Sequence, residues 1–169
     1  MMPETSYAIA LGSNRRHGRH GSPSSVLARA VEEIGAFATV TRVSNVRLTP
    51  AMGPAGRRFA NAALLARSGL PPLELLARLQ SLERAFGRRS GRRWGPRVLD
   101  LDIILFSAGV YRSRRLNVPH PAFRSRRFVL EPLLEIAPRW RDPVSGHTVR
   151  QLAYRARAHR PVDRSRTRL

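Results

Sequence analysis

The alternation of apolar and polar positions divides the first part of the chain into a strand, a helix and a second strand. The apolar run 7–11 ends at a Gly-Ser-Asn turn, which is typical of a strand that leads into a loop. Ser22 is suited to cap a helix whose first residue is Pro23. Apolar residues then recur at helical spacing, at Leu27, Val31 and Ile34. The β-branched stretch 39–46 predicts the next strand, and the Pro- and Gly-rich stretch 49–58 predicts a loop.

The second half of the pattern continues with a strand, a helix and another strand. The run 59–66 predicts a third strand, and the pair Pro71-Pro72 predicts the start of a second helix. This helix has one apolar stripe, made of Leu75, Leu76, Leu79, Leu82 and Phe86. After a loop rich in Arg and Gly, the run 98–106 predicts a fourth strand. Two short helices are predicted near the end of the chain, at 132–137 and 149–157.

The order of these elements predicts an α+β fold. The sequence βαββαβ is the ferredoxin-like, split βαβ arrangement, in which an antiparallel sheet carries its helices on one face. The segments after the fourth strand are C-terminal additions to it. Because 169 residues suit about one domain, we expect residues 1–158 to form a single domain. The stretch 159–169 is predicted to be a disordered basic tail.

Composition excludes several classes of function. All 31 basic residues are Arg, and with 11 acidic residues they give a net charge of +20. The absence of Lys excludes a Walker A loop and the strand lysine of protein kinases. The absence of Cys excludes disulfides and thiolate metal sites. No stretch approaches the roughly 18–20 apolar residues that span a membrane, and the N-terminus does not resemble a secretion signal, so we expect a cytoplasmic protein.

Two carboxylates on the predicted fourth strand are the main candidates for chemistry. Because side chains alternate along a strand, Asp100 and Asp102 face the same side, about 7 Å apart along the backbone. Carboxylate oxygens suit Mg²⁺, which typically combines one or two carboxylates with substrate phosphates. A solvated strand face whose carboxylates pair with arginines is the alternative interpretation.

The loop before this strand favours the metal interpretation. Residues 84–97 interleave three glycines with six arginines, namely Arg84, Arg88, Arg89, Arg92, Arg93 and Arg97. One guanidinium group can donate two parallel hydrogen bonds to the oxygens of a phosphate, so this loop is suited to bind a polyanion. Acidic metal ligands beside a cationic loop indicate a site for a metal–triphosphate complex.

The segment 93–104, Arg-Trp-Gly-Pro-Arg-Val-Leu-Asp-Leu-Asp-Ile-Ile, resembles the signature of the 6-hydroxymethyl-7,8-dihydropterin pyrophosphokinase family. Further segments resemble that family in the same order, at 8–14, 49–54, 59–63, 115–120 and 126–133. The resemblance covers roughly residues 7–138 and implies the βαββαβ fold. It also implies transfer of diphosphate from ATP to the pterin hydroxymethyl group, which yields AMP and the pterin diphosphate for folate biosynthesis, by a monomer.

The resemblance implies roles for particular residues. Asp100 and Asp102 match ligands of two Mg²⁺ ions that bridge ATP and the pterin, and the catalytic phosphate contacts match Arg88, Arg97 and His120. The implied ATP contacts are Gln80, Glu83, Arg93, Trp94, Arg115, Asn117 and Arg126. The implied pterin contacts are Thr49, Pro50, Met52, Phe59, Asn61 and Phe128, with the two phenylalanines on opposite faces of the ring.

Two other functions are compatible with parts of the pattern. An RNA-binding module of the RRM type shares the βαββαβ order, but it needs stacking aromatics, and only Tyr7 and Phe59 are candidates, without an RNP1-like motif. From charge alone we expect non-specific binding to nucleic acid at low salt. A catalytically silent pterin-binding paralogue is the second alternative, and the intact Asp pair and arginine set argue against it. The polar insert 15–21 departs from the family pattern.

Overall fold

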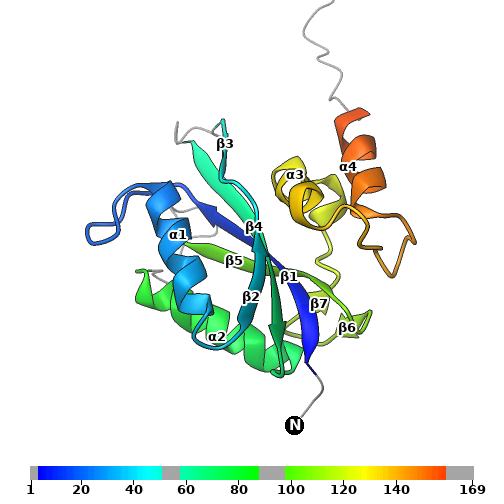
Figure 1. Cartoon of the computed structure of the whole chain (residues 1–169), viewed down its shortest axis with the longest axis horizontal. Coiled ribbons are helices and arrows are strands. Elements are labelled where there is room, and N and C mark those ends of the chain that lie inside the picture. The colour runs from blue at the N-terminus through cyan, green and yellow to red at the C-terminus, as the bar shows by residue number, and fades with distance from the viewer. Residues whose placement is uncertain (1–3, 51–57, 88–97, 159–169) are drawn as a thin grey trace, which may run out of the picture.

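An antiparallel sheet of five strands forms the centre of the molecule (Figure 1). The structure is a computed structural model and describes residues 4–50, 58–87 and 98–158. The strand order is β2-β4-β1-β5, and β3 also pairs with β4. The strands are β1 (Thr5–Ser13), β2 (Thr39–Val43), β3 (Arg47–Thr49), β4 (Phe59–Ser68) and β5 (Asp100–Phe106). All pairs in this sheet are antiparallel, as the strand pattern predicted.

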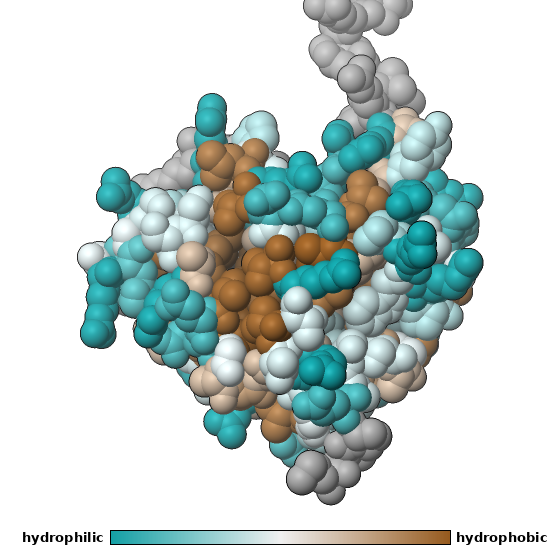
Figure 2. Space-filling view, viewed as in Figure 1, coloured by the Kyte–Doolittle hydropathy of each residue, from teal (hydrophilic) through white to brown (hydrophobic). Residues whose placement is uncertain are grey.

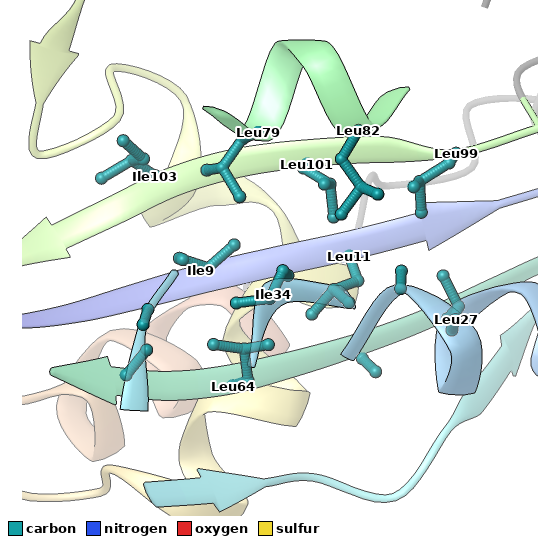
Figure 3. Packing of buried hydrophobic residues seen from close by; sticks show 14 of the residues in the cluster. Ile9, Leu11, Leu27, Ile34, Leu64, Leu79, Leu82, Leu99, Leu101 and Ile103 are labelled. Atoms are coloured by element: carbon teal, nitrogen blue, oxygen red, sulfur yellow. The ribbon is translucent and has the colours of Figure 1, made fainter. Parts of the chain in front are cut away.

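Helices lie on both sides of the sheet (Figure 1). Helices α1 (Pro23–Ile34) and α2 (Pro72–Ala85) bury their apolar stripes against one face. Figure 3 shows the resulting core, in which side chains of these helices meet those of the strands. Its labelled members are Ile9, Leu11, Leu27, Ile34, Leu64, Leu79, Leu82, Leu99, Leu101 and Ile103. The prediction of helices on one face therefore holds for α1 and α2.

The C-terminal helices build a second core on the opposite face. Helices α3 (Arg127–Ile136) and α4 (Val149–Ala158) pack their apolar side chains onto the strands from this side. The strands contribute Ala8, Ala63 and Ile104, and the helices contribute Leu130, Leu133 and Leu152. The small side chains of β1 and β4 allow close approach of the helices, which the sequence pattern did not indicate.

Local signals predicted some boundaries well and others wrongly. Ser22 caps α1, since its hydroxyl accepts the backbone N–H of Ser25 at 3.2 Å. The strand predicted at 39–46 ends at Val43, and a separate strand, β3, begins at Arg47. The break has a long-range cause, because the backbone N–H and side-chain amide of Asn45 both donate to Glu135 on α3, at 2.9 and 2.8 Å. The predicted loop 49–58 begins one residue later, because Thr49 ends β3.

The helix predicted at 132–137 begins five residues earlier, at Arg127. Pro132 was expected at its start, but it lies inside the helix. A proline inside a helix removes one hydrogen bond and crowds the carbonyl four residues earlier, and the buried stripe of Val129, Leu130 and Leu133 packs the helix onto the sheet despite that cost. The short pair β6 (Tyr111–Arg112) and β7 (Asn117–Val118) and the 3₁₀ helix η1 (Phe123–Ser125) were not predicted. The terminal helix was predicted to within one residue.

Part of the sheet surface is apolar and exposed. Figure 2, which has the same view as Figure 1, shows apolar surface in the middle of the molecule, over β2 and β4. Val43, Val46 and Leu48, in and between the edge strands β2 and β3, are among the exposed large apolar residues. Within the part of the chain that the structure describes, no helix has the length and apolar character needed to cross a membrane.

Candidate active site

The two aspartates lie side by side on one face of β5. Asp100 pairs with Gly12 and Asp102 with Ala10 of β1, and both are half-buried. Leu101 between them is buried in the core under α1 and α2. Because side chains alternate, both carboxylates point to the opposite face, the one on which α3 and α4 pack. The residues opposite them on β1, Gly12 and Ala10, have little or no side chain.

His120 lies next to this pair. Its backbone N–H donates to the carbonyl of Ile104 at 3.0 Å, which holds the segment after β7 against β5. Its Nδ1 accepts the N–H of Ala122 at 3.2 Å, so the neutral ring carries its proton on Nε2. Burial lowers the pKa of His120, the charge of Asp102 opposes that shift, and Arg126 adds to it. The site therefore places an uncharged imidazole, with an Nε2–H donor, beside two carboxylates.

A polar amide and an aromatic ring stand across the same face of the sheet. Asn61 on β4 pairs with Gly12, and its side chain is 5 % exposed. Its Nδ2 donates to the hydroxyl of Thr49 on β3 at 2.9 Å. Phe59, two residues before Asn61, is half-buried and shares this face. Two interstrand spacings separate Asn61 from Asp100 across β1, which is about 10 Å and enough for a flat bicyclic molecule.

The first turn of α3 supplies a second aromatic side chain and a cation. Phe128 packs against the core under α3 and α4. The guanidinium carbon of Arg126 lies 5.8 Å from the centre of the Phe128 ring, within the range of a cation–π contact. Arg126 also lowers the pKa of His120, so its charge reaches the carboxylate side of the site. Asp142 anchors this segment, because it is fully buried and accepts two hydrogen bonds from Arg124 of η1.

The remaining residues implied by the sequence have varied positions. Gln80 is half-buried on α2, and three residues are exposed, namely Pro50 after β3, Arg115 before β7 and Asn117 in β7. Glu83 differs from these because it is 2 % exposed and bonded to the backbone of β5. Five implied residues lie outside the described part of the chain, namely Met52, Arg88, Arg93, Trp94 and Arg97.

The donor set suits a metal that shares its coordination with a substrate. Among residues 4–50, 58–87 and 98–158, no three His, Asp or Glu side chains gather as a metal site. Asp100 and Asp102 offer carboxylate oxygens on one face, opposite the small residues Gly12 and Ala10 of β1. Mg²⁺ accepts such an arrangement, because it binds one or two carboxylates and completes its shell with water and phosphate oxygens.

One cavity among the described residues is lined by other elements than β5. It has a volume of about 510 Å³ and is lined by the loop before α1, by α1 and by the end of α2, including Arg19, Arg29, Glu33 and Phe86. Its Arg29 is already paired with Glu33. The carboxylate pair lies on β5, and we place the candidate site there.

Comparisons with known proteins find similarity over most of the chain. A family model described as 7,8-dihydro-6-hydroxymethylpterin-pyrophosphokinase (HPPK) matches residues 8–138. The chain is similar to 2-amino-4-hydroxy-6-hydroxymethyldihydropteridine pyrophosphokinases. It is 44 % identical to that of Synechocystis over 67 % of this chain and 58 % of that protein. It is 39 % identical to that of Pseudomonas aeruginosa over 86 % of this chain and 88 % of that protein.

Solved structures share the fold at lower identity. A crystal structure of wild-type Plasmodium falciparum HPPK-DHPS with pteroate superimposes with a TM-score of 0.71 at 11 % identity. The match covers 92 % of this chain and 45 % of that chain. This likeness shows the fold alone, a mixed antiparallel sheet with helices.

Proposed function

The chain belongs to the 7,8-dihydro-6-hydroxymethylpterin-pyrophosphokinase family, and we propose that it transfers the β,γ-diphosphate of ATP to 6-hydroxymethyl-7,8-dihydropterin. The products are AMP and the pterin diphosphate used in folate synthesis. One observation carries the proposal. A carboxylate pair, an uncharged histidine and an amide–aromatic pair share one face of the sheet, at a separation that suits a bicyclic substrate.

Asp100 and Asp102 would hold Mg²⁺, and we propose two ions. Bound there, Mg²⁺ offsets the charge of the triphosphate and favours attack at the β-phosphorus. The two carboxylates would hold the metal ions on the face of the sheet, at the edge strand β5. In the transfer, the hydroxymethyl oxygen forms a bond to the β-phosphorus, and the bond from that phosphorus to the oxygen shared with the α-phosphate breaks, so AMP leaves.

The pterin ring would lie between the β3–β4 edge and α3. Asn61 keeps Oδ1 and one N–H for the ring, since its other N–H donates to Thr49. These groups match the donors and acceptors along the amide-like edge of a pterin. Phe59 and Phe128 would cover its two faces, because flat aromatic surfaces bind best in offset or edge-on contact with other rings. Thr49, Pro50 and Met52 complete this end of the site in the proposal.

The phosphate chain would lie toward His120 and Arg126. The Nε2–H of the uncharged His120 can donate to a phosphate oxygen, and Arg126 adds a positive charge to the same side of the site. In the loop before β5, we assign Arg88, Arg93 and Arg97 to the same phosphates. We assign Trp94 of this loop to a position that covers the bound phosphates. Gln80, Arg115 and Asn117 are assigned to the nucleoside.

We also propose that the sheet has the ferredoxin-like βαββαβ topology with C-terminal additions. The strand order β2-β4-β1-β5 and the positions of α1 and α2 between the strands support this. In this arrangement β6, β7, η1, α3 and α4 are the additions. They complete the site, because they contribute His120, Arg126 and Phe128.

The proposal is tested by measuring turnover and binding with the same two proteins. Wild type and Asp102→Asn are supplied with ATP, Mg²⁺ and the hydroxymethyl pterin, and AMP and pterin diphosphate are measured by mass spectrometry. Wild type should form both products, and Asp102→Asn should form neither while it still binds the pterin in calorimetry. A wild type that binds the pterin and forms no AMP would be a silent paralogue. A wild type that binds neither substrate overturns the proposal.

A further inference from the structure

Glu83 connects the last turn of α2 to the strand that carries the two aspartates. Its side chain is 2 % exposed, and its Oε1 accepts the backbone N–H of Leu101 at 2.8 Å. That N–H belongs to the peptide group between Asp100 and Leu101. A buried carboxylate is therefore bonded to the backbone in the middle of the candidate metal site.

The position of β5 explains why this bond matters. β5 ends the strand path β2-β4-β1-β5, so its backbone has a strand partner on the β1 side. The N–H of Leu101 is instead bonded to a side chain of α2, and Leu101 is 4 % exposed. Buried backbone donors are nearly always paired, and a charged acceptor makes a stronger bond than a neutral one. Glu83 therefore supplies the pairing that a further strand would otherwise give.

This geometry is poorly suited to nucleotide binding. A residue that contacts ATP needs side-chain surface open to the site, and Glu83 has almost none. Gln80, one turn earlier on α2, is half-buried and keeps open surface. The sequence resemblance implies a nucleotide contact for both residues, and in the structure they differ in exposure.

We propose that Glu83 is a positioning residue that acts through the backbone of β5 on Asp100 and Asp102. Groups that bind a metal and a reacting phosphate must be held within about 0.5 Å of their productive positions. By fixing the peptide group between the aspartates, Glu83 keeps the direction of both carboxylates. The catalytic consequence rests on the proposed function, whereas the effect on the strand does not.

Three variants test this role. Glu83→Ala removes the acceptor, Glu83→Gln keeps an oxygen that can accept the same N–H, and Glu74→Gln is a control on the exposed first turn of α2. The first measurement is hydrogen exchange of the Leu101 amide by NMR, without ligands. Glu83→Ala should raise the exchange rate at least about tenfold, the effect of losing one charge-assisted hydrogen bond. Glu83→Gln should restore much of the protection, and Glu74→Gln should match wild type.

The second measurement separates turnover from nucleotide affinity. Glu83→Ala should lower kcat and raise the Mg²⁺ concentration needed for half-maximal turnover, while KM for ATP stays within about twofold. Glu83→Gln should recover part of kcat. A rise in KM for ATP with unchanged kcat would make Glu83 a nucleotide contact and overturn the proposal. Unchanged Leu101 exchange in Glu83→Ala would overturn it as well.

The effect of Glu83 on the strand can be tested even if the proposed function fails. If wild type forms no AMP, the proposed function fails, and the ¹³C signals of the Asp100 and Asp102 carboxylates during Mg²⁺ titration decide the positioning role. The chemical shifts of these signals should differ from those of wild type in Glu83→Ala and should be close to those of wild type in Glu83→Gln. If Glu83→Ala does not fold, Glu83→Gln decides alone. A partial loss of Leu101 protection together with a partial loss of kcat supports the proposal, and a raised KM for ATP as the sole effect overturns it.

Discussion

Replacing Asp142 with Ala should destabilise the chain far more than replacing an exposed acidic residue. Its carboxylate is fully buried and accepts hydrogen bonds from Nε and Nη2 of Arg124, at 2.6 and 2.8 Å. It also accepts the N–H groups of Val144 and Ser145, at 3.1 and 3.2 Å, and the Ser145 hydroxyl. Asp142 thus joins η1, which lies in the chain between His120 and Phe128, to the turn after α3.

The size of the effect follows from the burial of the two partners. Removing one member of a buried charge pair costs about 3–5 kcal/mol. The Arg124 side chain is 30 % exposed, so water can replace part of the lost bond and we expect about 3 kcal/mol. For a chain of this length this lowers Tm by about 6–12 °C. Glu32→Ala, which removes an exposed pair with Arg29, should cost less than about 1 kcal/mol and serves as the control.

The pH dependence of this effect has a definite sign. Burial raises the pKa of Asp142, but the hydrogen bonds from Arg124, Ser145 and Val144 outweigh it and hold the pKa well below its usual 3.8. A carboxyl with a lowered folded pKa stabilises the fold above its unfolded pKa, and this contribution is lost as the pH falls. The difference in unfolding free energy between wild type and Asp142→Asn should therefore shrink by about 1 kcal/mol from pH 5 to pH 3. Urea unfolding measures this, and a difference that stays constant or grows refutes the reasoning.

Five further variants have expected outcomes. Asp100→Ala and Asp102→Ala should each lose diphosphate transfer while the protein still folds, because neither side chain belongs to the two apolar cores; turnover near wild type at saturating Mg²⁺ would contradict the metal-ligand role. Phe59→Ala and Phe128→Ala should each weaken pterin binding about tenfold without changing ATP binding in calorimetry, and the reverse pattern would exchange the two pockets. Tyr7→Phe removes a buried hydroxyl that donates to Leu70 at 2.7 Å; it should lower the unfolding free energy by about 1 kcal/mol in urea and leave turnover unchanged, and a loss of turnover would link this end of β1 to the site.

Local signals in the sequence predicted most of the sheet and both helices under it. Ser22 and Pro23 mark the start of α1, and the stripe Leu75, Leu79 and Leu82 marks the buried face of α2. The alternation around Leu101 also predicted that the two aspartates share a face. These features depend on neighbouring residues, so periodicity and capping rules detect them.

Features that depend on distant residues were missed. The break between β2 and β3 follows from the bond of Asn45 to Glu135, 90 residues away. The early start of α3 follows from packing on the sheet, which outweighs the signal of Pro132. The link from Glu83 to Leu101 gave no local signal, because one hydrogen bond between a helix and an edge strand has no periodicity. The roles assigned to Met52, Arg88, Arg93, Trp94 and Arg97 stay predictions, since these residues lie outside the described chain.

The most direct test of the proposed reaction follows the β-phosphate of ATP. Wild-type protein is incubated with Mg²⁺, 6-hydroxymethyl-7,8-dihydropterin and ATP labelled with ³²P at the β-position, and the products are separated by chromatography. Transfer of the diphosphate as one unit predicts that the label appears in the pterin product, in equal amount to unlabelled AMP. Label that stays in ADP beside a pterin monophosphate, or that leaves as free diphosphate, would contradict the proposed reaction.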